Sequence, residues 1–270
     1  MPAFVCSTCG TQYPPSEVPP RACLICTDER QFVPAAGQSW TTLEQLQSTH
    51  SNKFRRLATG LTTIETTPAF GIGQRAIIAQ TPVGNVLWDC IALIDDATVD
   101  VLRGLGGVSA IAISHPHYYT TMLEWSRALG GVPIHLHADD RQWVMRGDGA
   151  VSFWEGDAKP IGPGLTLVRL GGHFAGGTVL HWADWDGGRG VLLSGDILQV
   201  VPSGHVSFMW SYPNLIPLSA AKVQRVAEIL EPFAYDAVYG AFSGRGQIDA
   251  NGKQVVTASV ARYIARISET

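Results

Sequence analysis

The 270-residue sequence has little charge: 16% of its residues are Asp, Glu, Lys or Arg, and the formal net charge is −4. It contains no long block of Lys and Arg. Binding to nucleic acid or to an acidic membrane surface depends on clustered basic side chains, so we expect neither partner. A small-molecule substrate is the better expectation, and the sequence leaves the oligomeric state open.

Long apolar runs are also missing, since no stretch approaches the roughly 20 residues of a membrane-spanning helix. The segment from Met1 to Cys6 has neither the basic region nor the apolar core of a secretion signal. These absences predict a cytoplasmic protein without a membrane segment. With 46% hydrophobic residues, the chain is long and apolar enough for one large core plus a small appendage.

Cysteine is scarce and unevenly placed, with only Cys90 outside the first 26 residues. We expect Cys90 to be a buried, small apolar side chain. The other four form two Cys-x-x-Cys pairs, each presenting two thiolates from one tight turn: Cys6, Cys9, Cys23 and Cys26. This pattern predicts a structural, tetrahedral zinc site. The alternatives are two disulfides, which a reducing cytosol disfavours, or a redox dithiol, which needs only one pair.

Proline is concentrated between the two cysteine pairs, at positions 14, 15, 19 and 20, and excludes a regular helix or central strand there. Such a small segment needs its ion to fold. We place the domain boundary near Gly37, with a zinc ribbon in residues 1–36 and the main domain in residues 37–270. The pattern from Thr41 to Glu44 is typical of a capping box and predicts a helix to about Thr49.

The main domain begins with strand-type segments and then alternates between strand and helix patterns. The first half has expected strands at 61–66, 75–81, 85–93, 108–113 and 132–136, and helices at 95–105 and 119–129. The second half has expected strands at 165–170, 178–183, 190–193 and near Ala237, and helices at 220–230 and 255–267. Two such halves predict an α/β fold in which helices cover a sandwich of sheets.

Candidate metal ligands occur where apolar strands end. His115 and His117 directly follow the apolar run 108–113. Residues two apart on an extended backbone point to the same side, so both imidazoles can bind one ion. His173 and Asp196 each follow a later strand segment, and we expect them to complete the same site.

These motifs resemble the metallo-β-lactamase fold superfamily over about residues 37–270. His115 and His117 match the start of its His-x-His-x-Asp-His motif, Gly172 to Gly176 match its Gly-His-x-x-Gly motif through His173, and Gly195-Asp196 matches its Gly-Asp motif. The resemblance implies an αββα sandwich with the metal site at one edge of the two sheets.

The chain departs from the family pattern at three positions. Tyr119 stands in the aspartate slot, Thr120 in the final histidine slot, and Phe242 nearest the slot of a late histidine. In the family these slots hold a second metal ion, whereas the first is held by the histidines matching His115, His117 and His173, with Asp196 bridging or completing the shell. The resemblance therefore implies one ion.

Three imidazoles and one carboxylate suit zinc or iron and leave a position open for water or substrate. With zinc, the resemblance implies a mononuclear hydrolase that attacks an ester, thioester or lactone carbonyl with activated water, which Asp196 orients or deprotonates. With iron, it implies a dioxygenase of sulfur compounds, as in the persulfide dioxygenase branch. A third reading is a catalytically degenerate module that binds a ligand or a partner. The sequence neither separates zinc from iron nor names the substrate.

Aromatic residues near the expected site have two interpretations. Tyr118 and Tyr119 can hydrogen-bond a metal-bound water or a developing oxyanion, or they can simply pack on the sheets. Met209, Trp210 and Tyr212 can wall an apolar substrate pocket, or pack beneath the following helix. The histidines at 50, 181 and 205 match no ligand pattern and are expected to be structural.

Overall fold

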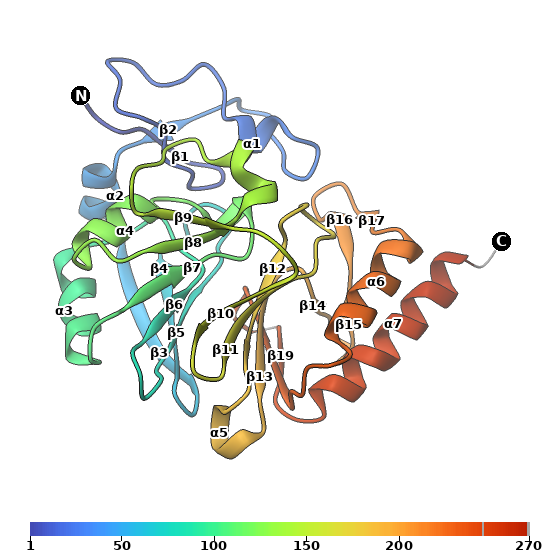
Figure 1. Ribbon diagram of the computed structural model, residues 1–270. Helices are drawn as coiled ribbons and strands as arrows, with labels where there is room; N and C mark the ends of the chain where they lie inside the picture. Colours follow the sequence, from blue (N-terminus) through green and yellow to red (C-terminus); the bar gives the residue numbers. More distant parts are fainter. Residues whose placement is uncertain (245, 269–270) are drawn as a thin grey trace. The chain divides into compact units, whose positions relative to one another are not determined.

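The computed structural model describes residues 1–244 and 246–268, so Arg245 and the last two residues of the predicted main domain lie outside it. The chain divides into two compact units. The first comprises Met1–Leu136 with Asp140–Phe153, and the second comprises His137–Asp139 with Trp154–Thr270. Each unit is built around one large sheet and has its own helices (Figure 1).

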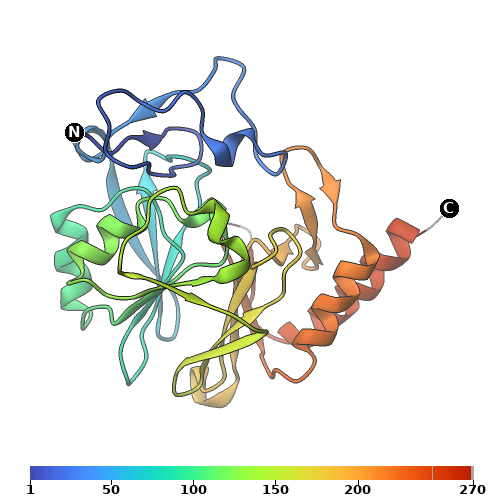
Figure 2. The same ribbon diagram turned by 45° about the horizontal axis from the view of Figure 1, so that its top comes forward.

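The N-terminal ribbon belongs to the first unit and is drawn in blue in Figure 2. Strand β1 (Val5–Cys6) pairs with β2 (Trp40–Thr41), and one helical turn, α1 (Leu24–Thr27), carries the second cysteine pair. As the prolines predict, the chain between the pairs is irregular apart from one bridge between Gln12 and Val5. The boundary near Gly37 stays a prediction.

Helix α2 (Leu43–Thr49) confirms the expected helix but begins one residue later than predicted. Its capping box joins Thr42 and Gln45: the Gln45 N–H donates to Thr42 Oγ1 at 3.3 Å, and Gln45 Oε1 accepts the Thr42 N–H at 3.1 Å. Thr41 is not available as the cap because it is paired with Val5 in β2. With Thr42 as the cap, the third helical residue is Gln45 instead of Glu44. Gln completes a capping box as well as Glu does, so the helix keeps both capping hydrogen bonds.

The first unit contains a seven-stranded sheet in the order β3-β4-β5-β6-β7-β8-β9. Its strands are β3 (Ser51–Ala58), β4 (Leu61–Thr67), β5 (Ala76–Ala79), β6 (Val86–Trp88), β7 (Ala110–Ala112), β8 (Ile134–His137) and β9 (Val151–Trp154). The pairs β6–β7 and β7–β8 are parallel, with α3 (Asp96–Gly104) and α4 (Met122–Ala128) as their crossover helices. The carboxyl ends of β6 and β7 therefore meet at one edge.

The second unit contains a six-stranded sheet in the order β10-β11-β12-β13-β18-β19. Its strands are β10 (Ala158–Gly162), β11 (Leu165–Arg169), β12 (Thr178–Trp182), β13 (Val191–Gly195), β18 (Ala237–Gly240) and β19 (Gln247–Ile248). The short elements are α5 (Trp185–Gly188) and two ribbons, β14 (Gln199–Val200) with β15 (Val206–Ser207), and β16 (Met209–Ser211) with β17 (Ile216–Pro217). Helices α6 (Ala220–Leu230) and α7 (Gly252–Ser268) lie side by side in Figure 1.

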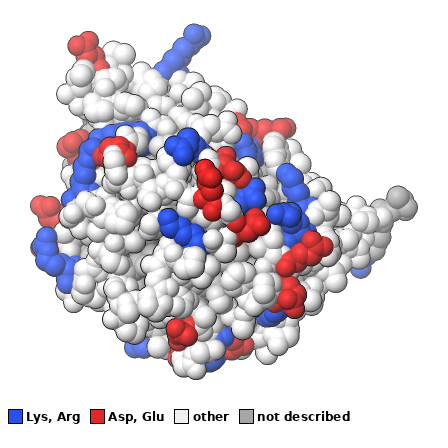
Figure 3. All heavy atoms as spheres, in the orientation of Figure 1, with Lys and Arg blue, Asp and Glu red and all other residues white. Residues whose placement is uncertain are grey.

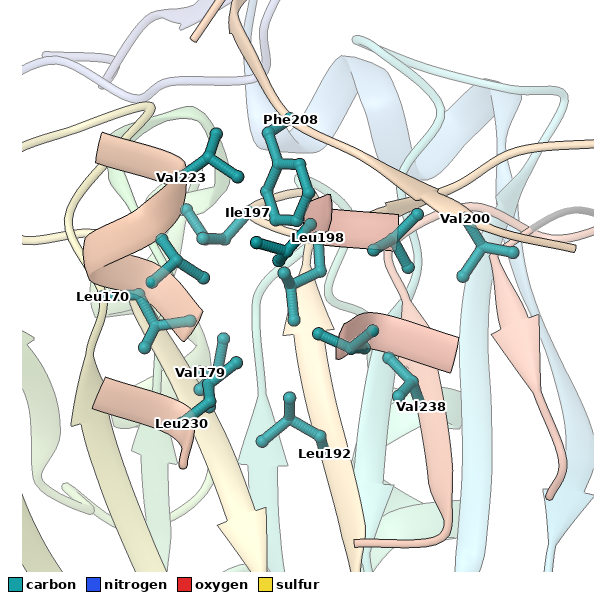
Figure 4. Close-up of a cluster of buried hydrophobic side chains, with 14 of the residues drawn as sticks. Leu170, Val179, Leu192, Ile197, Leu198, Val200, Phe208, Val223, Leu230 and Val238 are labelled. Carbon is teal, nitrogen blue, oxygen red and sulfur yellow. The ribbon is translucent and has the colours of Figure 1, made fainter. Parts of the chain in front are cut away.

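The core of the second unit forms where these two helices meet the sheet (Figure 4). Val223 and Val226 are spaced for one face of α6, and both are buried with Leu192 and Val238 of the sheet. Ile197 and its neighbour Leu198 belong to the same cluster. Because Ile197 directly follows Asp196, this core fixes the backbone that carries the expected ligand.

Within the described residues, no helix has the length and apolar character needed to cross a membrane. On the face of the molecule shown in Figure 3, Lys and Arg are interspersed with Asp and Glu among uncharged groups. This mixed surface agrees with the low charge of the sequence.

Candidate metal centres

The four cysteines of the ribbon come together, with their sulfur atoms all within 4.8 Å of one another and all four side chains buried. The Sγ atoms of Cys6 and Cys26 are 3.6 Å apart, as are those of Cys9 and Cys23. Four sulfurs at about 2.3 Å from one tetrahedral ion lie about 3.8 Å from each other, whereas a disulfide requires about 2.05 Å. The donor set therefore fits a tetrahedral metal ion and not two disulfides.

Polar groups support the thiolates. Gln38 Nε2 donates to Cys6 Sγ at 3.1 Å, while Gln38 Oε1 accepts the Cys23 N–H at 3.3 Å. Hydrogen bonds from the neighbouring cysteine thiols hold the pKa of Cys6 well below its ordinary value. Donors directed at a thiolate stabilise its charge and orient it, as expected around a metal ligand.

His115 and His117 form a half-site in the first unit. They follow the carboxyl end of β7, and the structure gives them ring nitrogens within 4.8 Å of each other. His115 has an extended backbone, as expected, but His117 does not, because Pro116–Tyr118 form one 3₁₀ turn. Both histidines are buried, and Ser114 Oγ lies 2.9 Å from His115 Nδ1.

Asp89 anchors this half-site, although no motif in the sequence marks it. It follows β6, where its backbone N–H donates to the Ala112 carbonyl at 2.9 Å and its Oδ1 accepts the Ser114 N–H at 2.7 Å. Its φ of 60° is left-handed, a conformation that Asp tolerates better than most residues. The sequence signal for Asp89 is a single carboxylate directly after a short apolar strand segment.

The residues after His117 are buried on the same loop. The Tyr118 ring stands edge-on to the His115 ring, with centroids 4.4 Å apart. Burial and the nearby Asp140 carboxylate hold the pKa of Tyr119 well above its ordinary value. The predicted catalytic roles of Tyr118 and Tyr119 stay predictions. Thr120, in the slot of the family's final histidine, is also buried and has a left-handed φ of 38°.

His173 and Asp196 form a second half-site in the second unit. His173 lies between β11 and β12, Asp196 follows β13, and their ligand atoms lie within 4.8 Å of each other. The loop of His173 closes tightly at Gly177, where an added Cβ would lie 2.5 Å from the Gly171 carbonyl oxygen. Glycine is therefore required at 177 to bring the histidine loop back to the sheet.

The segment predicted to wall a substrate pocket also supports this half-site. His173 Nδ1 donates to the Trp210 carbonyl at 2.7 Å, and the Tyr212 hydroxyl donates to the Asp196 carbonyl at 2.5 Å. The Tyr212 and His173 rings are in edge contact at 5.6 Å. Burial and the charge of Asp196 hold the pKa of Tyr212 well above its ordinary value. Met209 is half-buried in β16, and contact of Met209, Trp210 and Tyr212 with substrate stays a prediction.

The other histidines without a ligand pattern have structural partners. His181 Nε2 donates to the Ala234 carbonyl at 2.7 Å, and its ring packs against Phe233. His50 bonds to the Thr49 hydroxyl, and His205 contacts Ser203.

No protein-family model matches the chain. It is 45% identical over 271 residues to the uncharacterized protein YmaE of Bacillus subtilis (strain 168), covering 99% of this chain and 98% of YmaE. Among solved structures, it is similar to TMB-1 with a TM-score of 0.60 and 13% identity, and to the DIM-1 metallo-β-lactamase with 0.59 and 10%. Each covers 81% of this chain and 99% of the solved chain.

A further similar structure is the metallo-β-lactamase FIM-1 from Pseudomonas aeruginosa in its mono-zinc form, with a TM-score of 0.57 and 13% identity. It covers 81% of this chain and 97% of FIM-1. At such low identity these likenesses establish the fold, whereas the likeness to YmaE over nearly the whole chain establishes a family. The chain therefore has the metallo-β-lactamase fold, an α/β architecture extended by an N-terminal four-cysteine ribbon, and it belongs to the same family as YmaE.

Proposed function

We propose that the two half-sites together bind one divalent metal ion, and that the protein is a mononuclear metal-dependent hydrolase of a small ester, thioester or lactone. The ligands are His115, His117, His173 and Asp196, in the chain order of the family motifs. All four are buried, and each pair leaves a strand end with its ligand atoms close together. Three imidazoles and a carboxylate suit zinc or iron.

The hydrogen bond from His173 to Trp210 is the observation that most supports this proposal. A carbonyl oxygen only accepts, so Nδ1 of His173 carries the proton and Nε2 of the neutral ring keeps its lone pair. Metal-binding histidines are held in this way, with the second ring nitrogen donating to a carbonyl or a carboxylate. His181 donates to the Ala234 carbonyl in the same way, and what distinguishes His173 is that its ligand atom also lies within 4.8 Å of that of Asp196.

The chemistry assigned to this site needs an electrophile, a base and an oxyanion donor. A zinc ion held by these residues would polarise a substrate carbonyl and lower the pKa of a water molecule toward neutral pH. Asp196 is the carboxylate of the set, and where it does not bind the ion tightly it would orient the attacking water and accept its proton. The hydroxyls of Tyr118 and Tyr119, on the loop of His117, donate to the developing oxyanion.

The position of Tyr119 and Thr120 favours one ion over two, because neither is the carboxylate or imidazole that a second ion requires there. Met209, Trp210 and Tyr212 form the apolar wall for the acyl group of the substrate. We propose no nucleic-acid or membrane partner, and a cytoplasmic setting in which the ribbon thiolates stay reduced around a structural zinc ion.

Metal analysis of protein purified without chelators or added metal tests this function. We expect one metal in the ribbon and one in the histidine site, with His173→Ala losing only the second and the control His50→Gln losing neither. Hydrolysis of ester, thioester and lactone substrates should disappear with the second metal. Iron with oxygen consumption would instead support the dioxygenase, ribbon metal alone would support a binding module, and a third metal would contradict the single-ion site.

A further inference from the structure

The four-cysteine ribbon contacts the end of the loop that carries His115 and His117. Gln12 lies three residues after Cys9, and its backbone N–H donates to the Thr120 carbonyl at 3.1 Å. Thr120 lies three residues after His117 and has a left-handed φ of 38°. A non-glycine residue in this region persists only when its surroundings hold it there. The ribbon supplies part of that support.

Gly10 makes a second contact with the same loop. Its φ is 82°, and its N–H donates to the Cys6 carbonyl at 2.8 Å, which closes the turn of the first cysteine pair. A Cβ at this position would lie 3.2 Å from Ala92 Cβ and 3.3 Å from Thr120 Cγ2. The turn that presents two of the four thiolates therefore packs closely against Thr120, and a side chain at Gly10 would require its neighbours to shift.

The Gln12 side chain links the ribbon to the helix that follows the loop. Gln12 Oε1 accepts a hydrogen bond from Arg146, which also pairs with Glu124 of α4. The start of α4 is tied to the chain next to Gly10, since the Thr121 hydroxyl donates to the Ala92 carbonyl at 2.8 Å. Gln12 therefore contacts the end of the histidine loop through its backbone and helix α4 through its side chain and Arg146.

We propose that Gly10 and Gln12 are positioning residues, through which the metal-loaded ribbon holds Thr120 and the His115–His117 loop in the ligand-binding conformation. A small four-cysteine segment loses its folded geometry when its ion is removed. Gly10 and Gln12 then lose their place against Thr120, so the filled ribbon raises the metal affinity of the histidine half-site. This inference rests on the proposed function only in taking His115 and His117 as metal ligands.

Hydrogen exchange of the full chain tests the support directly and does not require metal at the histidines. The matched variants are Gly10→Ala and Gly37→Ala: both residues have a left-handed φ, but Gly37 has no neighbour within 4 Å of an added Cβ. We expect exchange over residues 114–121 to be roughly tenfold faster in Gly10→Ala than in Gly37→Ala. Equal exchange in the two variants would overturn the proposal.

Cobalt titration separates this inference from the proposed function, because thiolate ligands give charge-transfer bands that imidazole and carboxylate ligands do not. Gln12→Ala keeps the ribbon turn and its backbone hydrogen bond but removes the link to Arg146. We expect it to bind cobalt at the histidine site roughly tenfold more weakly, with unchanged ribbon bands. The exposed Gln224→Ala is the control.

Unchanged cobalt affinity in Gln12→Ala and Gly10→Ala would overturn the positioning role. A wild-type protein that binds cobalt only at the cysteines would instead overturn the proposed metal site. In that case the exchange comparison still decides whether the ribbon supports the loop.

Discussion

Replacing Asp89 should loosen the half-site of His115 and His117 by a calculable amount. The Asp89 side chain is buried, and its Oδ1 accepts the Ser114 N–H at 2.7 Å, one residue before His115. Asp89→Ala removes this acceptor and leaves the N–H buried. Asp89→Asn keeps an amide oxygen in the same place and loses the charge.

The expected cost follows from two contributions. A hydrogen bond to a charged, buried group contributes about 1.5–3 kcal/mol, and an alanine forced into the left-handed φ of 60° costs a further 1–2 kcal/mol or so. Together these give about 2.5–5 kcal/mol. Asn tolerates the left-handed region and still accepts the N–H, so Asp89→Asn should cost about 1 kcal/mol.

Urea denaturation of the two variants measures these costs from the shift of the midpoint at constant slope. Metal content per chain, measured on the same samples, should fall at the histidine site and not at the ribbon. A cost below about 1 kcal/mol for Asp89→Ala would refute the reasoning, since it lies below the contribution of the hydrogen bond alone. Equal costs for Ala and Asn would contradict both the acceptor contribution and the backbone contribution, and would leave the lost charge as the cause.

Three further predictions use the second unit. Gly190→Ala should lower the free energy of unfolding by about 2–4 kcal/mol, because its Cβ would lie 2.4 Å from the Ala234 carbonyl oxygen at a φ of 73°. The control Gly204→Ala has no neighbour within 4 Å of the added Cβ and should cost about 1 kcal/mol. Burial lowers the pKa of His181, so the unfolded chain binds more protons below about pH 6.5 and stability should fall as the pH drops through that value. Urea midpoints between pH 7 and 5 should show this fall in the wild type and a weaker one in His181→Gln. Tyr212→Phe should lower the free energy of unfolding by about 1 kcal/mol, with the ring contact kept, and a change in KM without a change in stability would indicate substrate contact instead.

The fold could be predicted where the apolar pattern is strong. Helix α6 has the predicted bounds because Val223, Val226 and Leu230 repeat at helical spacing. Strand β3 was missed because its sequence is mostly polar and carries Lys53, Arg55 and Arg56, as expected for an exposed edge strand. The two-residue strands such as β14 and β17 are too short for any periodic signal.

The side chains of the candidate site could be predicted from the sequence, but the groups that hydrogen-bond to them and hold them in place could not. The proposed ligands are residue types known to bind metals, and the strand ends that position them follow from the apolar runs before them. The acceptor for His173 is the main-chain carbonyl of Trp210, a group every residue has, so no residue type marks it. The sequence pattern placed the cap of α2 at Thr41 instead of Thr42 for a related reason. Thr41 pairs with Val5, which is far away in the sequence, so a local pattern cannot show it.

Thr120 stands in a slot where the resembling family has a metal ligand, and it is also the residue that the four-cysteine ribbon contacts. From the sequence, Thr120 is only the absence of a histidine in the last slot of the His-x-His-x-Asp-His motif. In the structure its carbonyl accepts the Gln12 N–H, and its methyl group lies 3.3 Å from where a Cβ at Gly10 would be. A histidine is larger than threonine and would have to fit beside the same turn, so the ribbon contact and a second-metal histidine compete for this position. The proposed single-ion site and the four-cysteine ribbon are therefore linked through Thr120, and Thr120→His should disturb the ribbon before it provides a ligand for a second metal.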